Sequence, residues 1–349
     1  MRRILNLRKH HYLKRLGIFL IAVALIVGIV GMVNCTPATK YNLTMAVSPY
    51  PDSGTAIDLT KGSPYPAGTV VNIQAVATPP YRFAGWIASA SAAEPADSED
   101  PSTTVIIPAE DLVITANFVG PLDHFTCYWM NPETSPYIGE VVSLEDQFGA
   151  VNATVEYAQA FGNPAEKWHG PVLTRISNPD HHLTVYDISY PESKEPQMWQ
   201  VVVDNQFGTQ NLIVFGPVML AVPTQKVAPG GHGSPVGLDH FLLYTVFGGS
   251  SVNVTVGLSD QFGHDGEVLV LEPIAFANPV QKTHDGNVTE IVNPEARLVF
   301  YSIAGEIVPY PQVKVVNQFG AQTLNISGPG FLAVPSEKLY YEPMNPLSP

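Results

Sequence analysis

The chain has 349 residues, of which 45% are apolar and only 14% are charged, and its net charge is −14. This length allows two or three domains, and the apolar content excludes wholesale disorder. A nucleic-acid-binding protein needs a basic face, so the acidic balance argues against that class. The 32 prolines and 28 glycines follow no period, which excludes collagen and disfavours long helices.

Residues 1–38 form a targeting segment. Six basic residues and no acidic residue lie within the first 15 positions, and the chain is then apolar from Leu16 to Val33. A basic flank before an apolar run is typical of a signal peptide or a signal anchor. Three fates stay open: cleavage after Ala38, retention as a membrane anchor, or lipidation of Cys35. In each case we expect the rest of the chain outside the cytoplasm, tethered to the cell membrane or secreted.

The charge is more acidic beyond the targeting segment. After residue 15 the chain has 11 basic and 31 acidic residues, a net charge of −20. Such a body stays soluble and is repelled by anionic lipid and nucleic acid. We interpret the charge as a solubility feature, and a Ca²⁺-binding surface is the alternative. The only cysteines are Cys35 and Cys127, and we expect Cys127 to be a buried, inert thiol on a strand.

Residues 41–118 form a first β-rich unit. Apolar and polar residues alternate over 41–47, 70–76 and 112–118, as in half-buried strands. Three segments follow in order: Tyr65-Pro-Ala-Gly-Thr-Val-Val71, Tyr81-Arg-Phe-Ala-Gly-Trp86 and Ile114-Thr-Ala-Asn-Phe118. They resemble the divergent internalin-B-type bacterial repeat, a small β module of exported surface proteins. The resemblance implies a spacer or adhesion-stalk element without chemistry of its own.

Residues 122–338 contain a duplication. Its copies span 122–226 and 238–338, and a Gly/Pro-rich linker at 227–237 joins them. Six segments, from the Leu-Asp-His-Phe starts to the Leu-Ala-Val-Pro ends, match at offsets of 116, 114, 115, 115, 112 and 112 residues. This steady registration establishes the repeat. A Pro-rich tail occupies 339–349.

Each copy is also duplicated within itself. A Gln-Phe-Gly element recurs with spacings of 59, 55 and 57 residues, which defines four related units. We expect a hairpin turn in each unit: the Gly takes a positive φ, the preceding Asp or Asn caps the turn, and the Phe packs back onto the sheet. A row of ligand contacts is the alternative. The turn residues are Gln147, Phe148, Gly149, Gln206, Phe207, Gly208, Gln261, Phe262, Gly263, Gln318, Phe319 and Gly320.

The starts, turns and ends of the two copies are similar to a domain of unknown function found as tandem repeats in exported bacterial proteins. The pattern of that family has cysteines after the His-Phe start and before the Asn-Pro pair. Here these positions hold Cys127, Leu243, Gly162 and Ala277, so the resemblance implies that the family disulfides are absent. No activity comes with this resemblance.

Motifs of known chemistry are missing from the sequence. There is no Walker loop, dinucleotide fingerprint, zinc-protease motif or nucleophile elbow, so we assign no catalytic, cofactor-binding or metal-binding residue. His124, His182 and His240 occupy equivalent positions, and the fourth unit has Arg297 there. Because Arg cannot ligate a metal, we interpret these histidines as strand-start groups bonded to backbone carbonyls. A metal site in each copy is the alternative.

Three tryptophans are candidate ligand contacts. Trp129 and Trp168 have no counterpart in the second copy, which favours a surface specific to the first copy over a common core. Together with Trp199 they could offer amphipathic rings to a glycan, and ordinary packing is the alternative.

The sequence therefore predicts an all-β protein. We expect a small β module and two β-sandwich or barrel-like domains, each with an internal pseudo-two-fold, behind one N-terminal transmembrane or signal helix. The expected function is that of a non-enzymatic bacterial surface protein without a cofactor. Its partners would be the membrane, through the N-terminal segment, and an extracellular glycan or protein, with no nucleic acid. A carbohydrate-binding accessory protein of an exported degradative system is the alternative. A third hypothesis is an exported hydrolase with a site between the copies.

Overall fold

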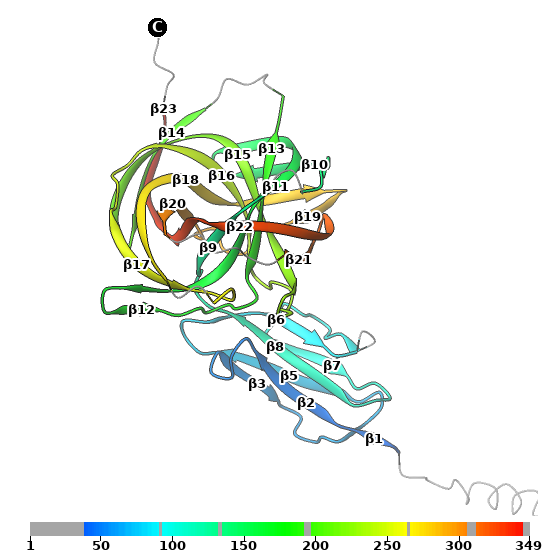
Figure 1. The fold of residues 1–349 in the computed structure, drawn as a ribbon. Helices are drawn as coiled ribbons and strands as arrows, with labels where there is room; N and C mark the ends of the chain where they lie inside the picture. Colours follow the sequence, from blue (N-terminus) through cyan, green and yellow to red (C-terminus); the bar gives the residue numbers. More distant parts are fainter. Residues whose placement is uncertain are drawn as a thin grey trace, which may run out of the picture.

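The structure is a computed structural model that describes residues 38–90, 93–131, 135–191, 197–263, 266–305 and 312–344. Within these ranges the chain forms the strands β1 to β23 and no α-helix, which confirms the all-β prediction (Figure 1). The predicted N-terminal helix, Cys35 and the end of the tail lie outside the described residues.

The N-terminal module consists of two facing three-stranded sheets. One has the order β2-β8-β6 and the other β3-β5-β7, while β1 and β4 pair separately. Alternation buries Val71, Ile73 and Ile114 in the core of the module, beside Trp86. The strands are β1 (Lys40–Tyr41), β2 (Leu43–Ser48), β3 (Gly54–Asp58), β4 (Tyr65–Pro66), β5 (Val70–Ala77), β6 (Arg82–Ala88), β7 (Ser102–Ile106) and β8 (Leu112–Val119).

Each of the four repeat units supplies a short strand and then a hairpin whose second arm is long. The short strands are β9 (His124–Met130), β13 (His182–Ser189), β16 (His240–Gly248) and β20 (Leu298–Ala304). The first hairpin arms are β10 (Val141–Asp146), β14 (Met198–Asn205), β17 (Val254–Ser259) and β21 (Gln312–Asn317). The long arms are β11 (Gly149–His169), β15 (Gly208–Ala228), β18 (Gly266–His284) and β22 (Gly320–Pro335). Three further strands follow long arms: β12 (Val172–Thr174), β19 (Asn287–Thr289) and β23 (Glu337–Met344).

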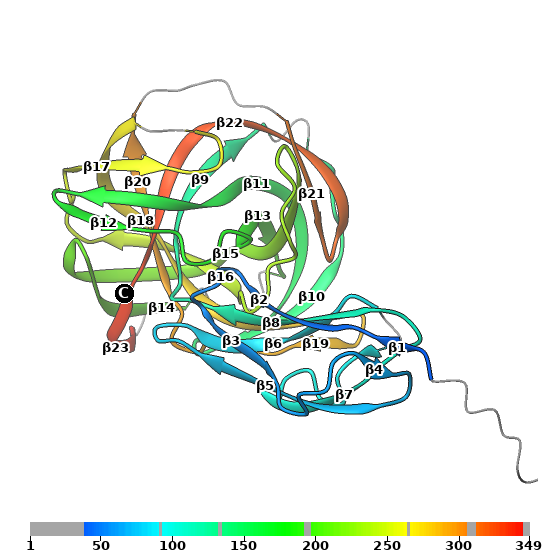
Figure 2. The ribbon, with the colours of Figure 1, turned by 90° about the horizontal axis from the view of Figure 1, so that it is seen from below.

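The short and long strands of both copies close into one antiparallel barrel. Its order is β9-β11-β13-β15-β16-β18-β20-β22, and β22 pairs again with β9. Figure 2 shows β22, in orange-red, beside β9. The expectation of two separate domains is therefore wrong. Each copy supplies four strands with two open edges, and pairing with the other copy removes these edges.

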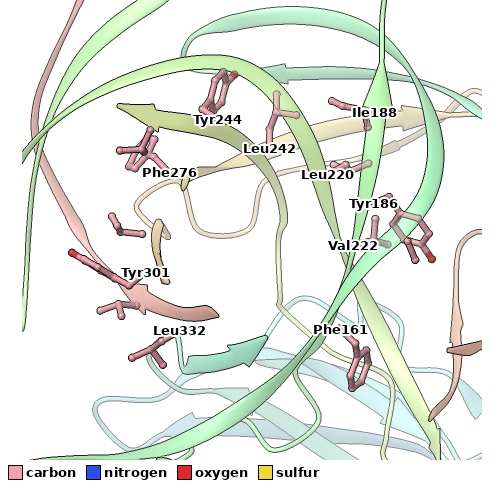
Figure 3. Packing of buried hydrophobic residues seen from close by; sticks show 14 of the residues in the cluster. Phe161, Tyr186, Ile188, Leu220, Val222, Leu242, Tyr244, Phe276, Tyr301 and Leu332 are labelled. Carbon is pink, nitrogen blue, oxygen red and sulfur yellow. The ribbon is translucent and has the colours of Figure 1, made fainter. Parts of the chain in front are cut away.

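Alternation along each barrel strand separates an inner from an outer apolar layer. On β9, Phe125 and Cys127 belong to one buried cluster, whereas Tyr128 and Met130 belong to another. The cluster with Phe125 draws on all eight barrel strands and fills the interior of the barrel. The cluster with Tyr128 also includes residues of β10, β14, β17 and β21, so it lies between the barrel and the hairpins that cover it. Figure 3 shows members of this outer layer distributed around the ring of strands.

Each hairpin covers a strand of the unit two positions away along the chain. The β10 arm pairs with the end of β18, and the end of β11 pairs with β17. In the same way, β14 pairs with β23, and the end of β15 pairs with β21. The two copies are thus joined both through the barrel wall and through exchanged hairpins.

Candidate functional site

The four Gln-Phe-Gly elements are capped turns. The backbone N–H of each turn Phe donates to the side-chain oxygen of the Asp or Asn two residues earlier, over 2.8–2.9 Å. The turn glycines have φ between 71° and 129°, a region that favours Gly. The predicted side-chain cap and the positive φ are therefore both confirmed.

The same capping residue also contacts a barrel strand that belongs to the other copy. Asp146 accepts a hydrogen bond from the Tyr244 hydroxyl at 3.1 Å, and Phe148 packs edge-on against the Tyr244 ring with centroids 5.1 Å apart. Equivalent pairs join the other three turns to the barrel: Asn205 to Tyr301, Asp260 to Tyr128 and Asn317 to Tyr186. The turn Phe thus packs onto the sheet as expected, but it packs against a strand that the other copy supplies.

The three equivalent histidines bind the glutamines of these turns. His182 Nε2 lies 2.9 Å from Gln261 Oε1, and His240 Nε2 lies 3.2 Å from Gln318 Oε1. The expected backbone carbonyl partner is found at His182 Nδ1, 3.1 Å from the Asp180 carbonyl oxygen. Burial lowers the pKa of His182 to about 4 and that of His240 to about 3, which keeps both rings neutral at physiological pH.

Arg297 takes the fourth of these positions. Its guanidinium donates to the carbonyl oxygens of Pro294 and Glu295 at 3.0 and 3.2 Å, and to the Glu295 carboxylate at 2.8 Å. Arg297 thus acts as a hydrogen-bond donor at the start of its strand. In the part of the chain that the structure describes, no three His, Cys, Asp or Glu side chains converge as a metal site would require.

Four lysines at equivalent positions of the four units form a feature that the sequence analysis did not single out. Lys226 lies over the Phe262 ring at 5.1 Å, and Lys167 lies over the Phe207 ring at 5.8 Å, so each cation faces the turn of the next unit. The available signal was a Lys at a fixed distance after the Asn-Pro or Val-Pro pair of each unit. Burial lowers the pKa to about 8 at each of Lys167, Lys226, Lys282 and Lys338.

The three candidate tryptophans lie in different environments. Trp199 is only 7% exposed and stacks on Phe148 at 4.5 Å, so it belongs to the outer apolar layer and not to a ligand surface. Trp168 is 37% exposed and borders an open hollow with Gly257 and Glu267. Trp129 is 43% exposed and is the only one of the three that lines a cavity of the barrel interior.

That cavity occupies one end of the barrel and measures about 350 Å³. All eight barrel strands contribute to its wall, and its polar members are Gln159 and Thr245. We call it the barrel cup. Apart from Trp129, no sequence pattern indicates the barrel cup, because the cup exists only when strands of both copies close around it. Its wall consists of Trp129, Gln159, Ala160, Val185, Val218, Met219, Leu243, Thr245, Ile274, Ala275, Phe300 and Phe331.

The other end of the barrel faces the N-terminal module. Leu122, Leu238 and Ala296 pack into the interior there and close it. The Tyr50 hydroxyl of the module donates to the Ile176 carbonyl at 3.2 Å, and Arg82 donates to the Gly237 carbonyl at 3.5 Å. The module therefore covers the closed end of the barrel, and no residue of the module lines the barrel cup. Figure 1 shows the module, in blue and cyan, below the barrel.

The Asp of each Leu-Asp-His-Phe start organises this closed end. Asp123 accepts hydrogen bonds from the backbone N–H groups of Ser177 and Asn178 at 2.7 and 2.8 Å. Asp239 accepts the equivalent bonds from Val292 and Asn293 at 2.6 and 2.9 Å. Burial raises the pKa of Asp123 to about 6 in spite of these hydrogen bonds. The two carboxyl groups thus act as caps of the neighbouring units.

Cys127 is a free thiol, fully buried in the barrel interior as expected, and burial raises its pKa well above the ordinary value. Among the described residues, no helix is long and apolar enough to cross a membrane.

Family models match most of the chain. The divergent InlB B-repeat domain matches residues 41–120. The repeat of unknown function (DUF7450) matches residues 100–212 and 182–335, and these two matches overlap in the second repeat unit. No curated protein and no solved structure matches the chain. Because its repeats account for more than half of the sequence, the chain belongs to the DUF7450 repeat family and carries a divergent InlB B-repeat domain in front of the repeats.

Proposed function

We propose that this chain is a non-enzymatic bacterial surface protein in which the InlB-like module is a spacer and the barrel is a binding body. The module would hold the barrel away from the membrane, to which residues 1–38 would tether it. The observation that carries this proposal is the placement of the module on the closed end of the barrel, with the barrel cup at the other end. In this orientation, the uncovered end faces away from the tether.

Surface labelling tests this placement. Ser251 is exposed in the connection between β16 and β17, whereas Cys127 is buried. A membrane-impermeant maleimide should label the Ser251→Cys variant on intact cells, and the unsubstituted chain serves as the control for background labelling. Labelling that occurs only after lysis would contradict a surface location.

Carbohydrate recognition is a second candidate function, and Trp168 favours it. Its indole lies against Gly257, where an added Cβ would come within 3.4 Å of the ring, and Glu267 lines the same hollow. An exposed ring beside a carboxylate offers a sugar both a stacking face and a hydrogen-bond acceptor. In a glycan panel, loss of binding in Trp168→Ala but not in Trp129→Ala would support this candidate. An unchanged profile in Trp168→Ala would exclude this hollow as the glycan site.

A further inference from the structure

The interior of the barrel is filled unevenly along its axis. Toward the module, Phe125, Phe241 and Leu298 are buried side by side in the inner layer. Toward the other end, Ala160 and Ala275 line the barrel cup together with larger residues such as Met219 and Phe331, and a cavity remains between them. An eight-stranded barrel is just wide enough either to be filled by side chains or to hold one small ligand. This barrel is filled at one end and hollow at the other.

Trp129 has a specific seat at the rim of the barrel cup. Its indole lies edge-on to Phe331 with ring centroids 4.3 Å apart. Gly330 provides the space, because a Cβ at that position would lie 2.2 Å from the indole nitrogen. The absence of a side chain at residue 330 thus lets the large ring lie against β22 and border the cup.

The chemistry of the wall selects against a charged ligand. Apart from Gln159 and Thr245, the described residues that line the barrel cup are apolar, and none is charged. Gln159 donates to the Asp187 carboxylate over 2.5 Å, so the charged group that contacts this polar wall residue is an acid. A carboxylate or phosphate ligand would lose its hydration here without gaining a cationic partner. A neutral apolar molecule loses nothing of that kind and removes apolar surface from water.

The volume sets the size of the occupant. A cavity of about 150 Å³ binds benzene in a protein interior. The barrel cup measures about 350 Å³ and lies within the range of small-molecule sites. It therefore has room for two fused or linked rings, or for an aliphatic molecule of similar bulk.

We propose that the barrel cup binds one small, neutral, apolar molecule of about two-ring size, with Trp129 as a wall of the site and Gln159 and Thr245 as the polar contacts at its mouth. This inference specifies the ligand class of the binding body proposed above and rests on that role. Location at the cell surface and occupancy of the barrel cup are separate properties, so each can fail without the other.

The experiment compares 2-naphthol with 2-naphthoate, which share the ring system and differ in charge. Equilibrium dialysis with the full chain in lipid nanodiscs measures binding, and empty nanodiscs give the background from partition into lipid. We expect saturable binding of one 2-naphthol per chain, and binding of 2-naphthoate weaker by about tenfold or more.

Variants assign the binding to the barrel cup. Ala275→Leu places a larger side chain in the cavity, and Thr245→Leu places one at its mouth, so the second remains informative if the first does not fold. Each folded variant should weaken 2-naphthol binding by about tenfold or more, as should Trp129→Ala, whereas Trp168→Ala should bind like the unsubstituted chain. Binding no higher than the background, equal binding of 2-naphthoate, or unchanged binding in the folded cavity variants would overturn the proposal.

Discussion

The Tyr128 hydroxyl donates a 2.6 Å hydrogen bond to Asp260 Oδ2 and so joins the first strand of one copy to a turn of the other. Asp146 and Tyr244 make the reciprocal contact. The Asp/Asn-Gln-Phe-Gly signature is therefore both a turn and an intercopy contact. This double role accounts for its recurrence in all four units, since each unit needs the turn and each of the four short barrel strands contacts one turn.

Removal of the Asp146 carboxylate should destabilise the whole barrel. Asp146 accepts from the Phe148 backbone, from Tyr244 and from Asn278 in a buried position. The Asp146→Ala variant leaves these donors without their acceptor, so we expect the free energy of unfolding to fall by about 2–4 kcal/mol in urea titrations. Ser143→Ala, at an exposed position of the same strand, is the matched control and should change it by less than about 0.5 kcal/mol. Equal losses in the two variants would contradict an intercopy role for the turn.

A disulfide can be introduced between the neighbouring strands β9 and β11. Cys127 and Gly162 are opposite each other on β9 and β11, and a Cβ added at Gly162 would lie 3.4 Å from the Cys127 sulfur. We expect Gly162→Cys to oxidise to an internal disulfide and to raise stability by about 3 kcal/mol relative to its reduced form. Mass spectrometry under non-reducing conditions and the melting temperature with and without reductant measure both effects.

The equivalent pair in the second copy provides the control. Ala277 lies opposite Leu243 on β18 and β16, so Ala277→Cys has no thiol partner and should stay reduced. Free thiols at both 127 and 162 after oxidation would show that the two strands are not paired in this register.

Acidification should destabilise the protein between pH 7 and pH 5. Four buried histidines have pKa values near 3 or 4 in the folded state and near 6.5 in the unfolded state, so the unfolded chain binds more protons over this interval. Each can contribute a slope of up to about 1.4 kcal/mol per pH unit. Asp123 acts in the opposite direction, because its pKa is raised to about 6 and this stabilises the folded state at low pH. Burial also raises the pKa of Asp146, Asp187 and Asp239, but less strongly, so we expect the histidines to dominate between pH 7 and pH 5. The histidines are His124, His181, His182 and His240.

Urea unfolding at pH 7, 6 and 5 measures this slope. His182→Gln removes one of the titrating groups and keeps a polar side chain. The free energy of unfolding of this variant should therefore depend less steeply on pH, by an amount that corresponds to about one bound proton. A free energy of unfolding that stays constant or rises on acidification would mean that these histidines are protonated in the folded state.

One copy alone should not form a folded monomer. A chain that ends at residue 236 keeps β9, β11, β13 and β15 but loses β22 and β16, the partners of its two outer strands. Such open edges promote association. We expect dimers or larger species in sedimentation velocity, in contrast to the full chain. A monomer that unfolds cooperatively would instead support two independent bodies.

Local features of this fold were predictable, and its closure was not. The turn chemistry at Asp146 and Gly149 follows from residues three positions apart, and the hairpin follows from it. The partner of each open edge lies in another unit, and no local pattern states whether a copy pairs with itself or with its neighbour. The regular offsets between the copies were compatible with two small bodies and with one large one.

The same distinction between local features and contacts with another unit explains which parts of the candidate site were predictable. Trp129 attracted notice because the second copy has Thr245 at the corresponding place, yet its seat depends on Gly330, 201 residues later in the chain. Trp199 looked similar in sequence, and only the exchanged hairpin places it against Phe148. The environment of a residue whose neighbours come from a different unit could not be predicted from local sequence patterns.

The seam between β9 and β22 gives the chain a late folding step. Phe125 must meet Ala333, which is synthesised near the C-terminus, before the ring of strands is complete. Contacts between such distant positions form slowly because a long loop has to be ordered first. During synthesis from the N-terminus, the first repeats therefore keep an unpaired strand edge until the last repeat has been made. A shorter nascent chain cannot complete the barrel.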